Sequence, residues 1–171
     1  MKRPVLVVAA HPDDEVLGCG GAIARWVQAG RLVHVLLLAD GETSRATEHV
    51  VVDPELLKQR QQAARQAASI LGCGVEILAM PDNRMDGLEL LDVVKPIEAA
   101  IDRLQPSTVL THYAGDVNID HRIVHEAVLA ACRPQPGHPV HGLLFFEVPS
   151  STEWRPPGSV QPFQPNLFID I

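Results

Sequence analysis

The sequence predicts an α/β protein with three layers, in which helices cover both faces of a mostly parallel central sheet. Near-continuous apolar runs at residues 4–10 and 32–39 have the composition of strands that are buried on both faces. Segments with helical periodicity separate these runs from each other and from the later ones, and such alternation is typical of a parallel sheet. With 171 residues, the chain has the length of one such domain.

The first two helices are predicted from their periodicity and their end signals. The first covers residues 17–29, where apolar residues recur on one face and Gly30 follows as a stop. The second covers 54–71, because Asp53 stands at the N-cap position and Gly72 at the C-terminal stop. Local chemistry thus predicts both ends of the second helix and the end of the first.

The second half of the chain continues the alternation. We expect a strand at 74–79, a helix at 92–104 and a strand at 107–111. A fourth helix is predicted over about 120–132, and a further strand follows at 142–148. The resulting order predicts a Rossmann-like fold, whose ligand site lies beyond the carboxyl ends of the strands.

The end of the sequence suggests one more strand. Residues 166–171 read NLFIDI, and no helix that could cover a strand follows them in the sequence. A bare terminal strand exposes unpaired backbone groups. We therefore expect either pairing with another copy of the chain, in a homo-oligomer, or a single domain over 1–171 that lacks a C-terminal segment.

Composition argues against several kinds of partner. The net charge is −7, and no cluster of Lys and Arg is present, so neither nucleic acid nor an anionic membrane surface is expected. No apolar run approaches the roughly 18 residues of a membrane span. The three cysteines lie far apart, which argues against a disulfide framework and favours a cytoplasmic location.

Polar side chains gather at the carboxyl ends of two predicted strands. Because parallel strands end at the same edge of a sheet, these groups are expected to converge in one crevice. Histidines together with carboxylates suit a divalent metal, and zinc is the first choice. The groups are His11, Asp13, Asp14 and Glu15 after the first strand, and His112, Asp120 and His121 around and after the fourth.

Two adjacent aspartates can divide the work of a catalytic metal site. Three protein ligands and one open position would lower the pKa of water to about 7. One carboxylate must then bind the metal, and a second can take the proton of the water as general base. Asp13 and Asp14 project differently from a tight turn and suit these two roles. Asp120 suits the carboxylate that accepts the other N–H of a ligating histidine.

Four stretches of the sequence resemble a known family. AHPDDEVLGCGG, residues 10–21, resembles the signature A-H-P-D-D-E-x-x-G-x-G-G of the PIG-L/LmbE family of zinc-dependent de-N-acetylases. THYAGDVNIDHRIV, residues 111–124, resembles the second family block, an Asp-His-Arg run. MPDNRMD and FEVPSSTEW are similar to stretches of the sugar-type bacterial members, so the resemblance covers essentially the whole chain.

The resemblance implies a metal site and a reaction. His11, Asp14 and His121 would bind zinc or another divalent ion, and Asp13 would be the general base. Arg84 would contact the substrate. The reaction would be the hydrolysis of the N-acetyl group of an amino sugar or its conjugate, of the N-acetylglucosamine type.

One position departs from the family pattern. Many members carry a histidine three residues before the last ligand, where it helps to stabilise the oxyanion or to protonate the amine. This chain has Asn118 there, which leaves a substrate contact as its expected role. His112 could supply the missing donor, and so could a C-terminal segment beyond residue 171.

Two functions from other classes compete with this hypothesis. The first is a metal-binding module of the same fold with impaired catalysis, which the Asn118 departure supports. The second is a nucleotide-binding regulator, suggested by Gly18, Gly20 and Gly21 after the first strand. That glycine pattern matches the dinucleotide fingerprint poorly, because a charged loop precedes it and the third glycine is absent. His125 stands four residues after His121 but is expected to be a packing residue rather than a ligand.

Overall fold

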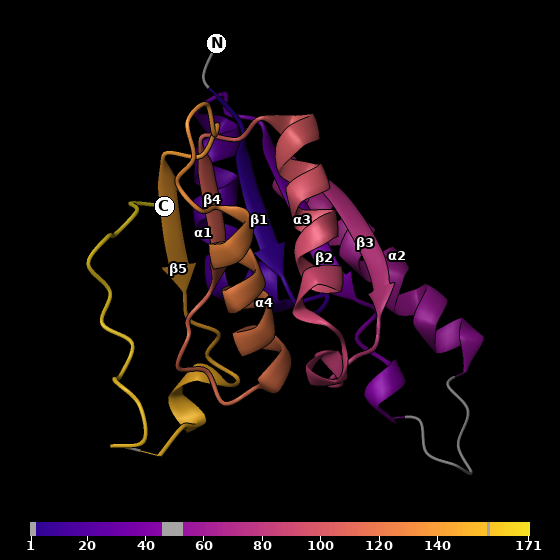
Figure 1. Ribbon diagram of the computed structural model, residues 1–171. Coiled ribbons are helices and arrows are strands. Elements are labelled where there is room, and N and C mark those ends of the chain that lie inside the picture. Colours follow the sequence, from indigo (N-terminus) through magenta and orange to yellow (C-terminus); the bar gives the residue numbers. More distant parts are fainter. Residues whose placement is uncertain (1–2, 46–52, 157) are drawn as a thin grey trace.

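The computed structural model describes residues 3–45, 53–156 and 158–171, and this part of the chain contains one five-stranded sheet (Figure 1). All neighbouring strands are parallel, in the order β3-β2-β1-β4-β5. β1 is central, and the chain continues to β2 on one side and later to β4 on the other, which makes the carboxyl edge of β1 a topological switch point. The strands are β1 (Val5–Ala9), β2 (Val33–Ala39), β3 (Gly74–Met80), β4 (Thr108–His112) and β5 (Gly142–Phe146).

Helices on both faces of the sheet complete the three layers, which confirms the predicted fold class. Figure 1 shows α3 and α4 on the near face and α1 and α2 behind the sheet. None of these helices is both long and apolar enough to cross a membrane. Their bounds are α1 (Asp14–Gln28), α2 (Pro54–Leu71), α3 (Leu90–Leu104) and α4 (Ile119–Ala131). Short 3₁₀ turns follow β2, β3 and β5: η1 (Thr43–Arg45), η2 (Met85–Gly87) and η3 (Thr152–Trp154).

The central strand explains why its sequence is uninterrupted by polar residues. All five residues of β1 are inaccessible to solvent. Leu6 and Val8 enter the core that α3 and α4 cover. Val5, Val7 and Ala9 enter the core that α1 and α2 cover. A strand with two buried faces needs apolar residues at every position rather than at alternate ones.

Both ends of α2 were predicted from local chemistry, whereas the start of α1 was not. The side chain of Asp53 accepts the backbone N–H of Glu55 at 2.9 Å, and Gly72 ends α2 with a left-handed φ of 74°, both as predicted. α1 begins at Asp14, earlier than the predicted residue 17. The difference arises because the carbonyl of Asp13 already accepts N–H groups of the first turn.

The glycines of α1 serve close packing. A Cβ atom on Gly18 would lie 2.3 Å from Cδ2 of Phe146 and 3.0 Å from the carbonyl oxygen of Glu147. A Cβ atom on Gly20 would meet nothing closer than 3.7 Å. Gly18 therefore lets α1 approach β5, and packing alone accounts for a glycine at this position.

The predicted strand at residues 166–171 is wrong. This segment runs beside β5 in Figure 1 but has no strand pairing, and a cavity of about 660 Å³ lies between the two. Leu167 and Phe168 remain 56% and 79% exposed, so these apolar residues, which suggested a strand, are not packed into the core. The segment before it is held instead by the Tyr113 hydroxyl, which donates to the carbonyl of Gln161 at 2.6 Å.

Candidate metal centre

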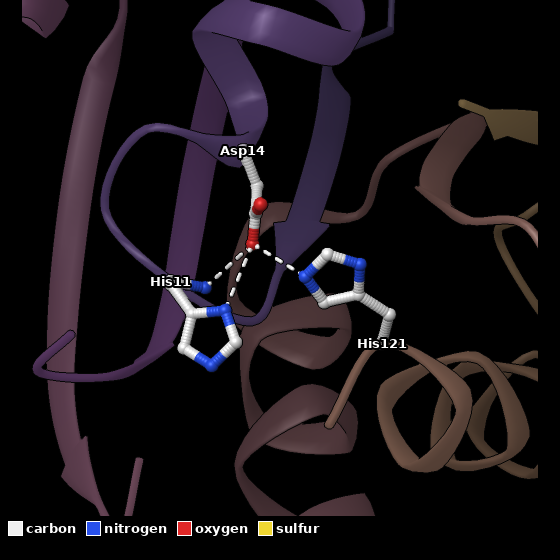
Figure 2. Close-up of side chains that lie close together, drawn as sticks. All are labelled: His11, Asp14 and His121. Atoms are coloured by element: carbon white, nitrogen blue, oxygen red, sulfur yellow. Dashed lines mark hydrogen bonds and ion pairs between the residues drawn. The ribbon is translucent and has the colours of Figure 1, made fainter. Parts of the chain in front are cut away.

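Three side chains from distant parts of the sequence meet at the carboxyl edge of β1 (Figure 2). His11 follows β1, Asp14 is the first residue of α1, and His121 lies in the first turn of α4. Oδ2 of Asp14 lies 3.3 Å from Nδ1 of His11 and 3.2 Å from Nε2 of His121. One ligand atom of each residue lies within 4.8 Å of the other two, which is the convergence that a single metal ion requires.

Each histidine of this trio has a carboxylate on its other nitrogen. Nε2 of His11 lies 3.0 Å from Oδ2 of Asp120 and 3.1 Å from Oδ1 of Asp82. Nδ1 of His121 lies 3.1 Å from Oδ2 of Asp116. Metal-ligating histidines usually donate their remaining N–H to such a partner, which fixes the tautomer and the ring orientation. The donor set of two imidazoles and a carboxylate, supported in this way, fits zinc.

A second group of potential ligands shares His11. His11, Asp82 and Asp120 also bring three ligand atoms together. Both oxygens of Asp120 are already used, because they accept the backbone N–H groups of Asn83 and Met85 at 2.6 and 3.0 Å. Oδ1 of Asp82 accepts the side-chain amide of Asn83. An ion there would compete with these three hydrogen bonds, whereas Asp14 accepts one backbone N–H, that of His11 at 2.9 Å, so the trio with Asp14 is the better candidate.

The electrostatics of the trio favour a positive charge. Burial opposes a charged His11, but hydrogen bonds with Asp120, Asp14 and Asp82 outweigh it and raise the pKa of His11 to about 11. Burial likewise opposes a charged Asp14, but the contacts with His11 and His121 hold the pKa of Asp14 well below its usual range. The carboxylates therefore stay ionised, and either a proton or a metal ion can balance them.

Asp13 stands beside the trio and forms no ion pair with any histidine that the structure describes. A cavity of about 240 Å³ lies in front of the trio and is lined by Asp13 as well. The side chain of Asp13 is 56% exposed, and its Oδ2 lies 3.7 Å from Nη1 of Arg60. Arg60 also binds the carboxylate of Glu42 at 2.9 Å. Burial and the neighbouring Asp14 carboxylate raise the pKa of Asp13, which makes it a better proton acceptor than an ordinary aspartate.

The remaining predicted residues lie at different depths around the cavity. Asn118 lines it and caps α4, since its side chain accepts the N–H of Asp120 at 2.9 Å. His112 is inaccessible, and its Nε2 accepts the N–H of Ala10 at 2.9 Å. Arg84 is exposed, and the described residues that line the cavity include neither Arg84 nor His112.

His112 supports its neighbours from behind. Its ring stacks on that of His121, with a centroid distance of 3.9 Å and an angle of 16°. Burial, together with the nearby His121, lowers the pKa of His112 to about 3, so the ring is neutral. Its carbonyl oxygen lies 2.9 Å from Nδ1 of His125, which is buried and absent from both candidate ligand groups.

Several residues that complete the site were not singled out as site residues from the sequence. The hydroxyls of Ser151 and Thr152 donate to Oδ2 of Asp116 at 2.9 and 2.7 Å, so the segment after β5 holds the carboxylate behind His121. Asp82 and Arg60 reach the site from the connection after β3 and from α2. Two signals were available, because the stretch FEVPSSTEW contains both hydroxyls and the stretch MPDNRMD contains Asp82.

The fold and this site define an α/β protein with a candidate His-Asp-His metal centre at the carboxyl edge of a parallel sheet. Residues 6–132 match the PIG-L family, described as GlcNAc-PI de-N-acetylase, and the chain belongs to this family. The resemblance seen in the sequence is thereby confirmed at the level of the family.

Three relatives show the range of the similarity. The uncharacterized deacetylase YaiS of Escherichia coli K12 is 31% identical over 176 residues, which cover 99% of this chain and 83% of that protein. The probable N-acetyl-alpha-D-glucosaminyl L-malate deacetylase 2 of Bacillus anthracis is 29% identical over 164 residues, 91% of this chain and 72% of that one. The 4-oxalmesaconate hydratase of Pseudomonas putida KT2440 is 31% identical over 186 residues, 99% and 68%.

A solved structure carries the same fold. The crystal structure of GalB, the 4-carboxy-2-hydroxymuconate hydratase from Pseudomonas putida KT2440, superposes with a TM-score of 0.67 at 30% identity. The match covers 81% of this chain and 59% of that one, so the chain spans less than two thirds of its length.

Proposed function

We propose that the protein is a metal-dependent hydrolase that removes the acetyl group from an N-acetylated amino sugar or its conjugate, of the N-acetylglucosamine type. The observation that carries this proposal is the convergence of His11, Asp14 and His121 beside Asp13, whose ion pair within the described residues is with Arg60 rather than with a histidine. Membership of the PIG-L family and the name of the Bacillus anthracis relative support the substrate class.

His11, Asp14 and His121 would hold the ion. When bound, zinc or another divalent ion supplies Lewis-acid polarisation of the amide carbonyl and makes a water molecule acidic near neutral pH. Asp120 orients His11, and Asp116 orients His121, each through the nitrogen that faces away from Asp14. The ligand atoms are therefore prearranged before the substrate enters.

Asp13 carries the proton in this proposal. Its carboxylate takes a proton from the attacking water, whose oxygen forms a bond to the acetyl carbon. The carbon–nitrogen bond then breaks, and Asp13 gives the proton to the departing amine, so that acetate and a free amino sugar leave. Arg60 holds the Asp13 carboxylate at the edge of the cavity.

The other predicted residues act around this centre. Asn118, which lines the cavity, contacts the substrate in this proposal, and so does Arg84, an exposed residue that follows the lining residue Asn83 in the sequence. His112 contributes by keeping the ring of His121 in place rather than by touching the substrate. All three cysteines are free, and we place the protein in the cytoplasm.

A second candidate reaction is hydration. The hydratase of Pseudomonas putida matches 99% of this chain, and Arg60 could bind a carboxylate of an unsaturated acid. Asp13 would then take a proton from the attacking water, whose oxygen would bond to one carbon of a carbon–carbon double bond, and the proton would go to the other carbon. A metal-binding module with impaired catalysis is the third possibility, because Asn118 replaces the family histidine.

One set of assays separates these functions. The purified protein is loaded with zinc and incubated with N-acetylglucosaminyl conjugates, and released acetate and free amine are measured. The same preparation is given 4-oxalmesaconate, whose hydration is followed by absorbance. Acetate release that EDTA abolishes supports the deacetylase. Hydration alone supports the second candidate, and zinc binding without either turnover supports the third.

A further inference from the structure

Asp13 has a backbone conformation that needs support. Its φ is 132° and its ψ is −28°, whereas residues with a side chain rarely have a positive φ. Such conformations persist only when the surrounding contacts hold them, and they gather at functional sites. The contacts of Asp13 therefore identify the groups that aim its side chain.

Both backbone polar groups of Asp13 are engaged. Its carbonyl accepts the N–H groups of Val16 and Leu17 at 3.0 and 2.9 Å, which forms the first turn of α1. Its N–H donates to Oε2 of Glu15 at 3.1 Å. The Glu15 side chain thus folds back along the chain and closes a small ring around Asp13 and Asp14.

The Glu15 carboxylate is held by backbone N–H groups, that of Asp13 and its own. Glu15 is only 3% exposed. In the described part of the chain, no basic side chain lies within ion-pair distance of its carboxylate. It does not line the cavity in front of the metal trio. Burying a carboxylate without a cation is costly unless its hydrogen bonds are satisfied. The hydrogen bond to Asp13 accounts for an acceptor at this depth.

We infer that Glu15 is a positioning residue, which holds the N–H of Asp13 and thereby aims the Asp13 carboxylate into the cavity beside Asp14. The inference rests on the proposed function, in which Asp13 carries the proton. Asp14 has its own partners in His11 and His121, so loss of Glu15 should disturb proton transfer far more than metal binding.

Two substitutions test the hydrogen bond. Glu15→Leu fills the buried volume but removes the acceptor, and it should lower kcat about 100-fold, the cost of a misplacement of about 1 Å. Its KM and zinc affinity should change less than about 3-fold. Glu15→Gln keeps an oxygen that can accept the N–H, and its kcat should stay within about 3-fold of wild type. Asp92→Leu, which removes a first-turn carboxylate from α3, is the control and should leave kcat unchanged.

A double substitution shows whether Glu15 acts through Asp13. In an Asp13→Asn background, Glu15→Leu should cause no further loss of kcat, because the group that it positions is already gone. Equal losses in the two backgrounds would overturn the inference. So would a folded Glu15→Gln protein with the low kcat of Glu15→Leu, a result that stands even if the leucine variant does not fold.

Hydrogen exchange of the Asp13 amide gives a readout that needs no activity. Measured by NMR, exchange should be slow in wild type and in Glu15→Gln, and at least about 10-fold faster in Glu15→Leu. If wild type releases no acetate, the proposed function fails while this measurement still decides the inference. Unchanged exchange in Glu15→Leu would refute the positioning role, whatever the activity.

Discussion

Oδ2 of Asp116 lies 3.1 Å from Nδ1 of His121, on the side of the ring that faces away from the candidate metal centre. The same oxygen accepts the hydroxyls of Ser151 and Thr152. The carboxylate is therefore fixed by the segment after β5, and it in turn fixes the ring that supplies a candidate metal ligand. A site built in this way should be sensitive to changes that never touch the ion.

Asp116→Asn should weaken zinc binding by about 10- to 100-fold, because an amide is a poorer acceptor for the His121 N–H than a carboxylate. Competition with a chromophoric chelator measures the dissociation constant. Asp102→Asn on the exposed side of α3 is the control and should leave it unchanged. An unaltered zinc affinity in Asp116→Asn would contradict the supporting role of this carboxylate.

His11→Ala and His121→Ala should each lose the metal. Wild-type protein dialysed against zinc should retain about one equivalent, and either variant should retain far less after the same treatment. His141→Ala, which changes an exposed histidine remote from the trio, is expected to retain the full equivalent. Metal analysis of the dialysed proteins checks the result, and full retention in both variants would exclude the ligand assignment.

Asp13→Asn and Asp14→Asn should differ in kind. Asp13→Asn should keep the zinc and lose turnover by about 10²- to 10⁴-fold, the usual contribution of a general base. Asp14→Asn should weaken zinc binding itself, because Asp14 is the carboxylate that meets both histidines. Zinc content and kcat are measured on the same preparations. Exchanged phenotypes would mean that the roles of the two aspartates are reversed.

Gly18→Ala and Gly20→Ala form a matched pair on α1. The first should destabilise the protein by about 1–3 kcal/mol, because the added methyl group meets the backbone of Glu147 as well as the ring of Phe146. The second has room and should stabilise α1 by up to about 1 kcal/mol. Urea denaturation gives both values. Equal stabilities would show that α1 does not depend on its close approach to β5.

The metal-free protein should reach a narrow stability plateau near pH 6.5. Burial lowers the pKa of His112 to about 3, so its contribution is present above about pH 6.5 and is lost as the pH falls toward 3. Burial opposes the charged forms of Asp82 and Asp116, but hydrogen bonds with His11 and His121 lower both pKa values to about 2. Their stabilising contribution is present above the unfolded value of about 3.9 and is lost as the pH falls through about 2. The raised pKa of His11, about 11, gives a contribution that is present below about pH 6.5 and is lost as the pH rises through about 11.

Denaturation in EDTA across this pH range tests the expectation. The free energy of unfolding should fall on both the acidic and the alkaline side of the plateau. With zinc in excess, the alkaline loss should disappear, because the ion replaces the proton on His11. A flat profile in EDTA from about pH 5 to pH 9 would contradict the assigned ion pairs.

The parts of the fold that were predictable depend on local chemistry. Asp53 and Gly72 mark the ends of α2 because capping and left-handed backbone need only neighbouring residues. The apolar run of β1 indicates a strand with two buried faces, because such a strand needs an apolar residue at every position. NLFIDI misled because its pattern is that of a strand, whereas pairing depends on what lies next to it in space.

The candidate site likewise has residues that could be predicted from the sequence and residues that could not. His11, Asp14 and His121 lie next to strand ends, so the topology alone predicts that they meet. Asp82 and Arg60 come from a connection and from a helix face, where no periodicity distinguishes a carboxylate or a guanidinium in the site from one in solvent. Their positions depend on how the loops after β2 and β3 fold against each other.

The order of the strands gives the trio a mechanical consequence. His11 follows the central strand β1, and Asp14 begins α1 behind the sheet. His121 belongs to α4 on the opposite face (Figure 1). An ion bound by all three residues would link the two helical layers across the carboxyl edge of the sheet. This link can form only after α1 and α4 have both packed against the sheet. Metal uptake would therefore report the completion of folding. It would also restrain the residues that line the cavity in front of the trio.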